Sequence, residues 1–135
     1  MPDLTINSDT AIEILLKARQ YDAKVEETDP NSGSNPTDDH SVDALESGPG
    51  DQTRHELFSA IHDLNDDEQR DLIALIWLGR GDFALSEWAS ARAAAGDIGR
   101  ANMARYVSGI PLVSDYLEDG LSNFNQTVGD YLERN

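Results

Sequence analysis

Carboxylates are the most abundant chemically reactive side chains in this chain, which has 135 residues and 26 aspartates and glutamates. Acid–base catalysis by carboxylates requires two of them held in a cleft, where their surroundings separate the two pKa values. With so many acids, close pairs arise by chance along the whole chain, and no pair stands out. We therefore assign no catalytic residue, and a small carboxylate-dependent hydrolase or transferase is kept as an alternative function.

Metal and thiol chemistry find little support in the residue pattern. The chain has no cysteine, which excludes thiolate nucleophiles, zinc–cysteine sites and disulfides. His55 and His62 lie seven residues apart on one predicted helix, about 10 Å along its axis, which is too far to share an ion. Residues 63–67 resemble the start of a calcium loop, but Glu68 replaces the required glycine and Ala74 replaces the final acid. We expect no metal and no cofactor.

The turn that carries Arg80 and Asp82 is the strongest candidate for a binding role. Arg80 follows the C-terminal end of a predicted helix, where a positive charge is favourable, and glycines on both sides leave its backbone uncovered. We expect nearby polar and aromatic residues to converge on this turn. The candidate binding surface comprises Arg80, Asp82, Glu87, Trp88, Asp115 and Tyr116, and a purely structural helix cap is the alternative interpretation.

The net charge of −16 is unevenly distributed. Residues 22–71 contain 15 acidic and 3 basic side chains, which accounts for −12 of the total. Repulsion from phosphates disfavours ordinary nucleic-acid binding, so a protein partner with a basic surface is favoured. A helix-turn-helix over residues 91–109 is also disfavoured, because Arg92 stands where the motif needs a small residue. An acidic mimic of nucleic acid, and a solvated surface without a partner, are the alternatives.

The elements that position these residues centre on a predicted helix over residues 65–78. Asn65 and Glu68 have the spacing of a capping box. The segment from Leu72 to Leu78 is almost entirely apolar, so other elements must surround it. Gly79 suits the left-handed residue that ends a helix. We therefore expect this helix to be buried at the centre of the fold.

Apolar spacing predicts further helices on both sides of the central one. A first helix is expected over residues 9–24, with Leu4 and Ile6 packing before it as a short arm. Further helices are expected over residues 53–64, from Asp82 or Ser86 to 95, up to Val107, and from Pro111 to 124, with a weak final turn near 128–132. Residues 26–52 are rich in polar residues, glycine and proline and form a long polar loop, either mobile or ordered against the domain.

The predicted fold is a single all-α domain over residues 1–135, with five to six helices around the central one. The N-terminal sequence has neither the basic segment nor the apolar core of a signal peptide. Its longest apolar run, residues 72–78, is far shorter than the roughly 20 residues of a membrane span. We expect a cytoplasmic protein that is not inserted in a membrane, and the sequence leaves its oligomeric state open.

Five segments give the chain a resemblance to a known family. They are residues 17–24 (KARQYDAK), 29–39 (DPNSGSNPTDD), 64–83 (LNDDEQRDLIALIWLGRGDF), the Glu87-Trp88 pair, and 109–121 (GIPLVSDYLEDGL). Together they resemble the bacterial family of domain of unknown function 3775. The resemblance implies no activity, cofactor or catalytic residue, and it implies that residues 29–39 belong to the domain's pattern. The predicted function is a non-enzymatic protein-interaction or regulatory module.

Overall fold

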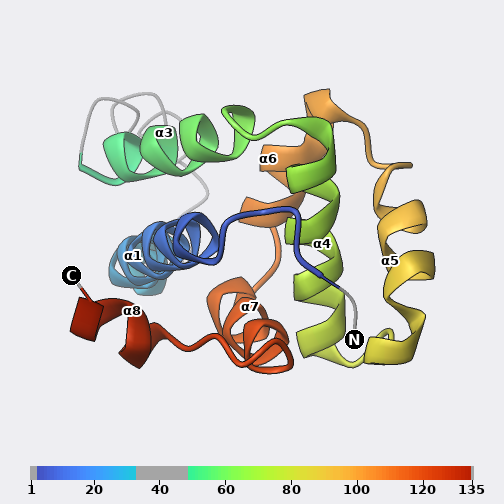
Figure 1. Cartoon of the computed structure of the whole chain (residues 1–135). Coiled ribbons are helices and arrows are strands. Elements are labelled where there is room, and N and C mark those ends of the chain that lie inside the picture. The colour runs from blue at the N-terminus through green and yellow to red at the C-terminus, as the bar shows by residue number, and fades with distance from the viewer. Residues whose placement is uncertain (1–2, 33–48, 135) are drawn as a thin grey trace.

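The computed structural model describes residues 3–32 and 49–134, and among them the side chains of residues 3–23 and 52–134 (Figure 1). The all-α class is confirmed, because the described residues form helices and no strand. These helices are α1 (Ser8–Ser32), α3 (Pro49–His62), α4 (Asp66–Arg80), α5 (Trp88–Ala95), α6 (Arg100–Ser108), α7 (Val113–Ser122) and α8 (Val128–Arg134), with a short 3-10 helix, η2 (Leu85–Glu87). The described residues thus hold seven α-helices, α4 and six others, as predicted, and the expected weak final turn is the helix α8.

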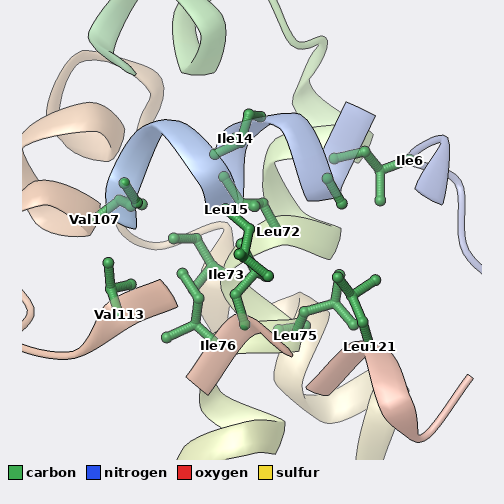
Figure 2. Packing of buried hydrophobic residues seen from close by; sticks show 14 of the residues in the cluster. Ile6, Ile14, Leu15, Leu72, Ile73, Leu75, Ile76, Val107, Val113 and Leu121 are labelled. Atoms are coloured by element: carbon green, nitrogen blue, oxygen red, sulfur yellow. The ribbon is translucent and has the colours of Figure 1, made fainter. Parts of the chain in front are cut away.

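Helix α4 is the centre of the fold, as the sequence predicts. It packs against α7, α5 and α6, and Figure 1 shows these helices on different sides of it. Its buried side chains join one core with residues of α1 and α7, among them Leu15 and Leu121 (Figure 2). The buried apolar residues of α4 are Leu72, Ile73, Ala74, Leu75, Ile76 and Leu78. A helix with so wide an apolar surface gains its stability from the neighbours that cover it.

The two ends of α4 differ in how well the sequence predicts them. The capping box is confirmed: the Asn65 side chain accepts a hydrogen bond from the Glu68 N–H (2.8 Å), and the Glu68 carboxylate accepts one from the Asn65 N–H (2.9 Å). The predicted role of Gly79 is wrong, because Gly79 lies inside α4. The left-handed residue is Gly81, with φ of 93°, whose N–H donates to the carbonyls of Trp77 and Leu78.

Gly79 has a different function, which is to let α4 and α7 approach closely. A Cβ atom on Gly79 would lie 1.7 Å from the Tyr116 carbonyl oxygen, and one on Gly120 would lie 2.1 Å from the Leu75 carbonyl oxygen. No side chain fits at these distances. The two backbones therefore touch at two glycines, one on each helix, and this contact fixes the position of α7 on α4.

Other helix boundaries also differ from the predicted ones. Helix α7 begins at Val113, because Pro111 lies in the turn before it and Leu112 adopts a left-handed conformation with φ of 61°. Helix α1 extends to Ser32 and α3 begins at Pro49, each beyond the predicted limit. The predicted polar loop lies mostly at residues 33–48, outside the described residues.

The N-terminal arm, defined here as residues 3–7, packs against the helical body as expected. Ile6 is 2 % exposed and belongs to the core, and Leu4 packs partly against it. Asn7 then caps α1 by accepting a hydrogen bond from the Asp9 N–H (2.7 Å). Within residues 3–32 and 49–134, no helix is both long enough and apolar enough to span a membrane.

Candidate functional site

Aromatic side chains gather with a charged pair at the C-terminal end of α4. The rings of Trp77 and Phe83 stack with centroids 5.7 Å apart, and Trp77 meets Tyr106 of α6 edge-on at 6.3 Å. The Trp77 indole N–H donates to the Tyr106 hydroxyl (2.8 Å). All three residues are half-buried. We call these three rings, together with Arg80 and Asp82, the α4-end cluster.

Arg80 and Asp82 form the charged part of the α4-end cluster. Two guanidinium nitrogens, Nε and Nη2, donate to the same Asp82 oxygen at 2.9 and 2.6 Å. The hydrogen bond to Asp82 raises the pKa of Arg80 above its ordinary value, and a hydrogen bond to Tyr106 adds to this, while burial acts in the opposite direction. Arg80 is therefore a permanent cation held at the edge of an aromatic surface.

Of the six predicted binding residues, Arg80 and Asp82 are in direct contact. Glu87 lies five residues along the chain, where its carboxylate accepts a hydrogen bond from the Ala84 N–H (2.8 Å) and closes the start of η2. Its side chain thus has a structural role at the turn that follows the α4-end cluster.

Among the other predicted residues, Trp88 and Asp115 contact other parts of the fold. Trp88 is 5 % exposed and packs edge-on against Phe124, with centroids 4.9 Å apart. Asp115 pairs with Arg19 of α1 at 3.2 Å. Tyr116 is half-buried, and its carbonyl oxygen lies against Gly79. Buried Trp88 thus presents no ring to a partner, and Asp115 lies where α7 meets α1.

Sequence reasoning missed Trp77, Phe83 and Tyr106 as surface residues. The apolar run over residues 72–78 places Trp77 in the core. One signal was available: Trp77 and Arg80 are three residues apart, so they share a face of α4 at its end. That spacing indicates a tryptophan reaching toward the surface.

A second polar site lies inside the fold, around Asp71. This aspartate is 0 % exposed. One of its oxygens accepts hydrogen bonds from the backbone N–H groups of Thr5 and Ile6, the latter at 3.1 Å. The other oxygen accepts from Nε of Arg92 in α5 at 2.5 Å. The carboxylate therefore joins the N-terminal arm, α4 and α5.

The Asp71 site does not supply the pair of acids that the enzyme alternative needs. Among the described residues, the buried polar side chains are Gln69, Asp71 and Ser114, so Asp71 is the single buried carboxylate there. All its bonds go to arginine and backbone donors. No group of three or more histidines or acids in the described residues is arranged to hold a metal ion. The arrangement therefore supports a structural role for Asp71.

Arg100 closes the corner between α3 and α4. Its guanidinium donates to the carbonyls of His62 (3.0 Å) and Leu64 (2.7 Å) and pairs with Asp66 at 3.1 Å. The last carbonyls of a helix have no partner within the helix. Arg100, at the start of α6, supplies one for α3 and so fixes α6 to this corner.

Comparison with known families identifies the chain. A family model described as "Protein of unknown function (DUF3775)" matches residues 54–126. The chain belongs to this family, and the matched region runs from α3 to α7, so it contains both the Asp71 site and the α4-end cluster. The resembling segments 64–83, 87–88 and 109–121 fall within the match, and 17–24 and 29–39 precede it. No curated protein and no solved structure matches the chain.

Proposed function

We propose that this protein is a non-enzymatic interaction module, acting in the cytoplasm, and that the α4-end cluster is its binding surface. The observation that carries the proposal is the gathering of Trp77, Phe83 and Tyr106 around Arg80 outside the core. Tryptophan, tyrosine and arginine are the residue types that most often dominate the energy of protein interfaces. Here they are held in place by mutual hydrogen bonds, so that binding orders few side chains.

The charge of the chain favours a basic partner. The net charge of −16 attracts a positively charged surface and speeds its encounter with the protein. At the α4-end cluster, a lysine or arginine of the partner can lie over the half-exposed face of Phe83 or Trp77 and donate a hydrogen bond to Asp82. The partner we propose is a protein segment with a basic residue next to an apolar one.

Site-specific photo-crosslinking in living cells tests this surface. A photoreactive phenylalanine analogue replaces Phe83 in one strain, and the exposed Gln20 of α1 in a control strain. We expect one defined crosslinked product from position 83 and none from position 20. Products of equal size and yield from both positions, or none from position 83, would overturn the assignment of the surface.

A pair of charge reversals tests the role of the cation. Arg80→Glu reverses a charge within the α4-end cluster, and Arg54→Glu makes the same change at an exposed arginine on α3. Loss of the position-83 product with Arg80→Glu, and its retention with Arg54→Glu, supports the proposal. Equal loss with both variants shows that net charge alone governs the contact and contradicts a specific surface.

A further inference from the structure

The way in which Asp71 holds the N-terminal arm resembles the recognition of a bound peptide. Two consecutive N–H groups, those of Thr5 and Ile6, converge on one carboxylate oxygen from 65 and 66 residues away along the chain. The side chain of Ile6, the second of these residues, enters the core. In Figure 1 the arm leaves the start of α1 and runs along α4 toward α5. A backbone that bends at Thr5 and Ile6 and one apolar anchor are thus bound together.

Asp71 is a charged side chain in the interior of the fold. Removing a charged pair from water costs free energy, which its attraction repays only with good geometry and further hydrogen bonds. Asp71 meets that condition only when Arg92 and both arm N–H groups are in place. The acid therefore selects a segment that presents N–H groups at this point.

The residues that recognise the arm and the arm itself lie in different parts of the chain. Asp71 and Arg92 fall within the family match, residues 54–126, whereas the arm precedes it. The arm is also weakly anchored: of its residues, only Ile6 is fully buried, and Thr5 and Asn7 are exposed. In contrast, α1 buries Ala11, Ile12, Ile14, Leu15 and Ala18 by itself. Segments with few buried contacts open locally without unfolding the rest.

We propose that the Asp71–Arg92 site is a binding site for a peptide segment with a bent backbone, occupied in the resting protein by the chain's own N-terminal arm as a releasable strap. The segment it takes presents two consecutive backbone N–H groups and an apolar side chain on the second residue. Asn7, which caps α1, is the point at which the strap detaches. This site is distinct from the α4-end cluster, and its test is independent of the proposed partner.

Hydrogen exchange of the full chain, resolved by residue, tests whether the strap releases. The amides of Thr5 and Ile6 are expected to be protected, because both donate to a buried carboxylate. We expect their protection factors to be at least roughly tenfold smaller than those of the α4 amides near Leu75, because release of the arm breaks fewer contacts than global unfolding. Protection equal to that of Leu75 would show that the arm leaves only on global unfolding, and would overturn the proposal.

Binding of a free peptide tests the site. Ile6→Asp in the full chain displaces the arm, and an acetylated peptide of residues 3–8 with the native isoleucine is titrated into it by NMR. A second peptide is methylated on the backbone nitrogen of the isoleucine, which removes one donor to Asp71. We expect saturable binding of the first peptide, shifting the Arg92 side-chain signal, and affinity weaker by roughly tenfold for the second.

Absence of saturable binding, or equal affinity for both peptides, overturns the proposal. If Ile6→Asp fails to fold, Ile6→Ala is the replacement variant, because it weakens the anchor without burying a charge. In the wild-type chain the arm competes in cis, so the same peptide must bind more weakly there. Binding to the wild-type chain that is as tight as to the variant would place the peptide elsewhere on the protein and would also contradict the site.

Discussion

Helix α4 contributes one residue to each of two arginine–aspartate pairs, which have the same chemistry in opposite settings. In the first, Asp71 is 0 % exposed and bonds to Arg92, whose side chain is 27 % exposed. In the second, Arg80 and Asp82 are 34 % and 41 % exposed. The first pair joins three segments that are far apart in the sequence, whereas the second joins residues on either side of one glycine. The setting of each pair, and not its chemistry, decides whether it serves the fold or the surface.

The energetics of the two pairs follow from this difference. A buried charge that loses its partner stays buried and unpaired, which costs about 3–5 kcal/mol. An exposed pair is already solvated on both sides, and its coupling is typically about 0.2–1 kcal/mol. We therefore expect Asp71–Arg92 to be required for stability and Arg80–Asp82 to be nearly dispensable for it.

The largest effect is expected from Asp71→Ala. The substitution removes the charged acceptor of Arg92 Nε and of two arm N–H groups, so the free energy of unfolding should fall by about 3–5 kcal/mol. Urea unfolding followed by circular dichroism measures it. Asp97→Ala, at an exposed aspartate, is the control and should change stability by less than about 0.5 kcal/mol. A loss below about 1 kcal/mol for Asp71→Ala would contradict the role we give to the buried pair.

The C-terminal half of α4 is held by a backbone contact with α7 instead of a buried charge, and Gly79→Ala tests this contact. The added Cβ would lie 1.7 Å from the Tyr116 carbonyl, so α4 and α7 must separate, at a cost of about 1–3 kcal/mol. Gly129→Ala in α8, where the nearest atom is 3.9 Å away, is the matched control. It should be neutral or stabilising, because alanine favours helix. Equal effects of the two substitutions in urea unfolding would refute a glycine contact between α4 and α7.

Arg100→Ala probes a third arginine, whose expected effect on stability lies between the effects of the two pairs. It removes bonds to two carbonyls at the end of α3, so we expect a loss of about 1–2 kcal/mol in the free energy of unfolding. Arg105→Ala, an exposed arginine on the same helix, should cost less than about 0.5 kcal/mol. If both variants unfold at the same urea concentration, the corner between α3 and α4 does not depend on Arg100.

The smallest effect on stability is expected from Arg80→Ala. Loss of an exposed pair should lower the free energy of unfolding by at most about 1 kcal/mol. In 1 M salt, where surface charges are screened, the difference from the wild type should shrink further. Thermal unfolding at low and high salt measures both. A loss above about 2 kcal/mol would assign Arg80 to the fold and remove it from the binding surface.

Local signals in the sequence predicted the central helix and its start. The capping box at Asn65 and the apolar run to Leu78 depend on residues within one helix, and both are present in the structure. The end of α4 was predicted two residues early. Gly79 and Gly81 are both suited to a left-handed turn, and only the approach of α7 at Gly79 distinguishes them.

Features that depend on distant residues could not be predicted. Asp71 and Arg92 are 21 residues apart, and the two arm residues that bind Asp71 are 66 and 65 residues from it. The two tryptophans show the same limit. Trp88, a residue of the candidate binding surface, is buried against Phe124, whereas Trp77, in the apolar run of α4, is only half-buried. Which tryptophan faces solvent is decided by α6 and α7, whose positions no local pattern gives.

Double-mutant cycles on the two pairs, measured in the same urea series, test the central claim most directly. Each cycle compares the single alanine variants with the double variant and so isolates the coupling within the pair. We predict a coupling of at least about 2 kcal/mol for Asp71–Arg92 and below about 0.5 kcal/mol for Arg80–Asp82. Equal couplings, or a larger one for Arg80–Asp82, would contradict the division of α4 into a buried structural pair and an exposed pair available for binding.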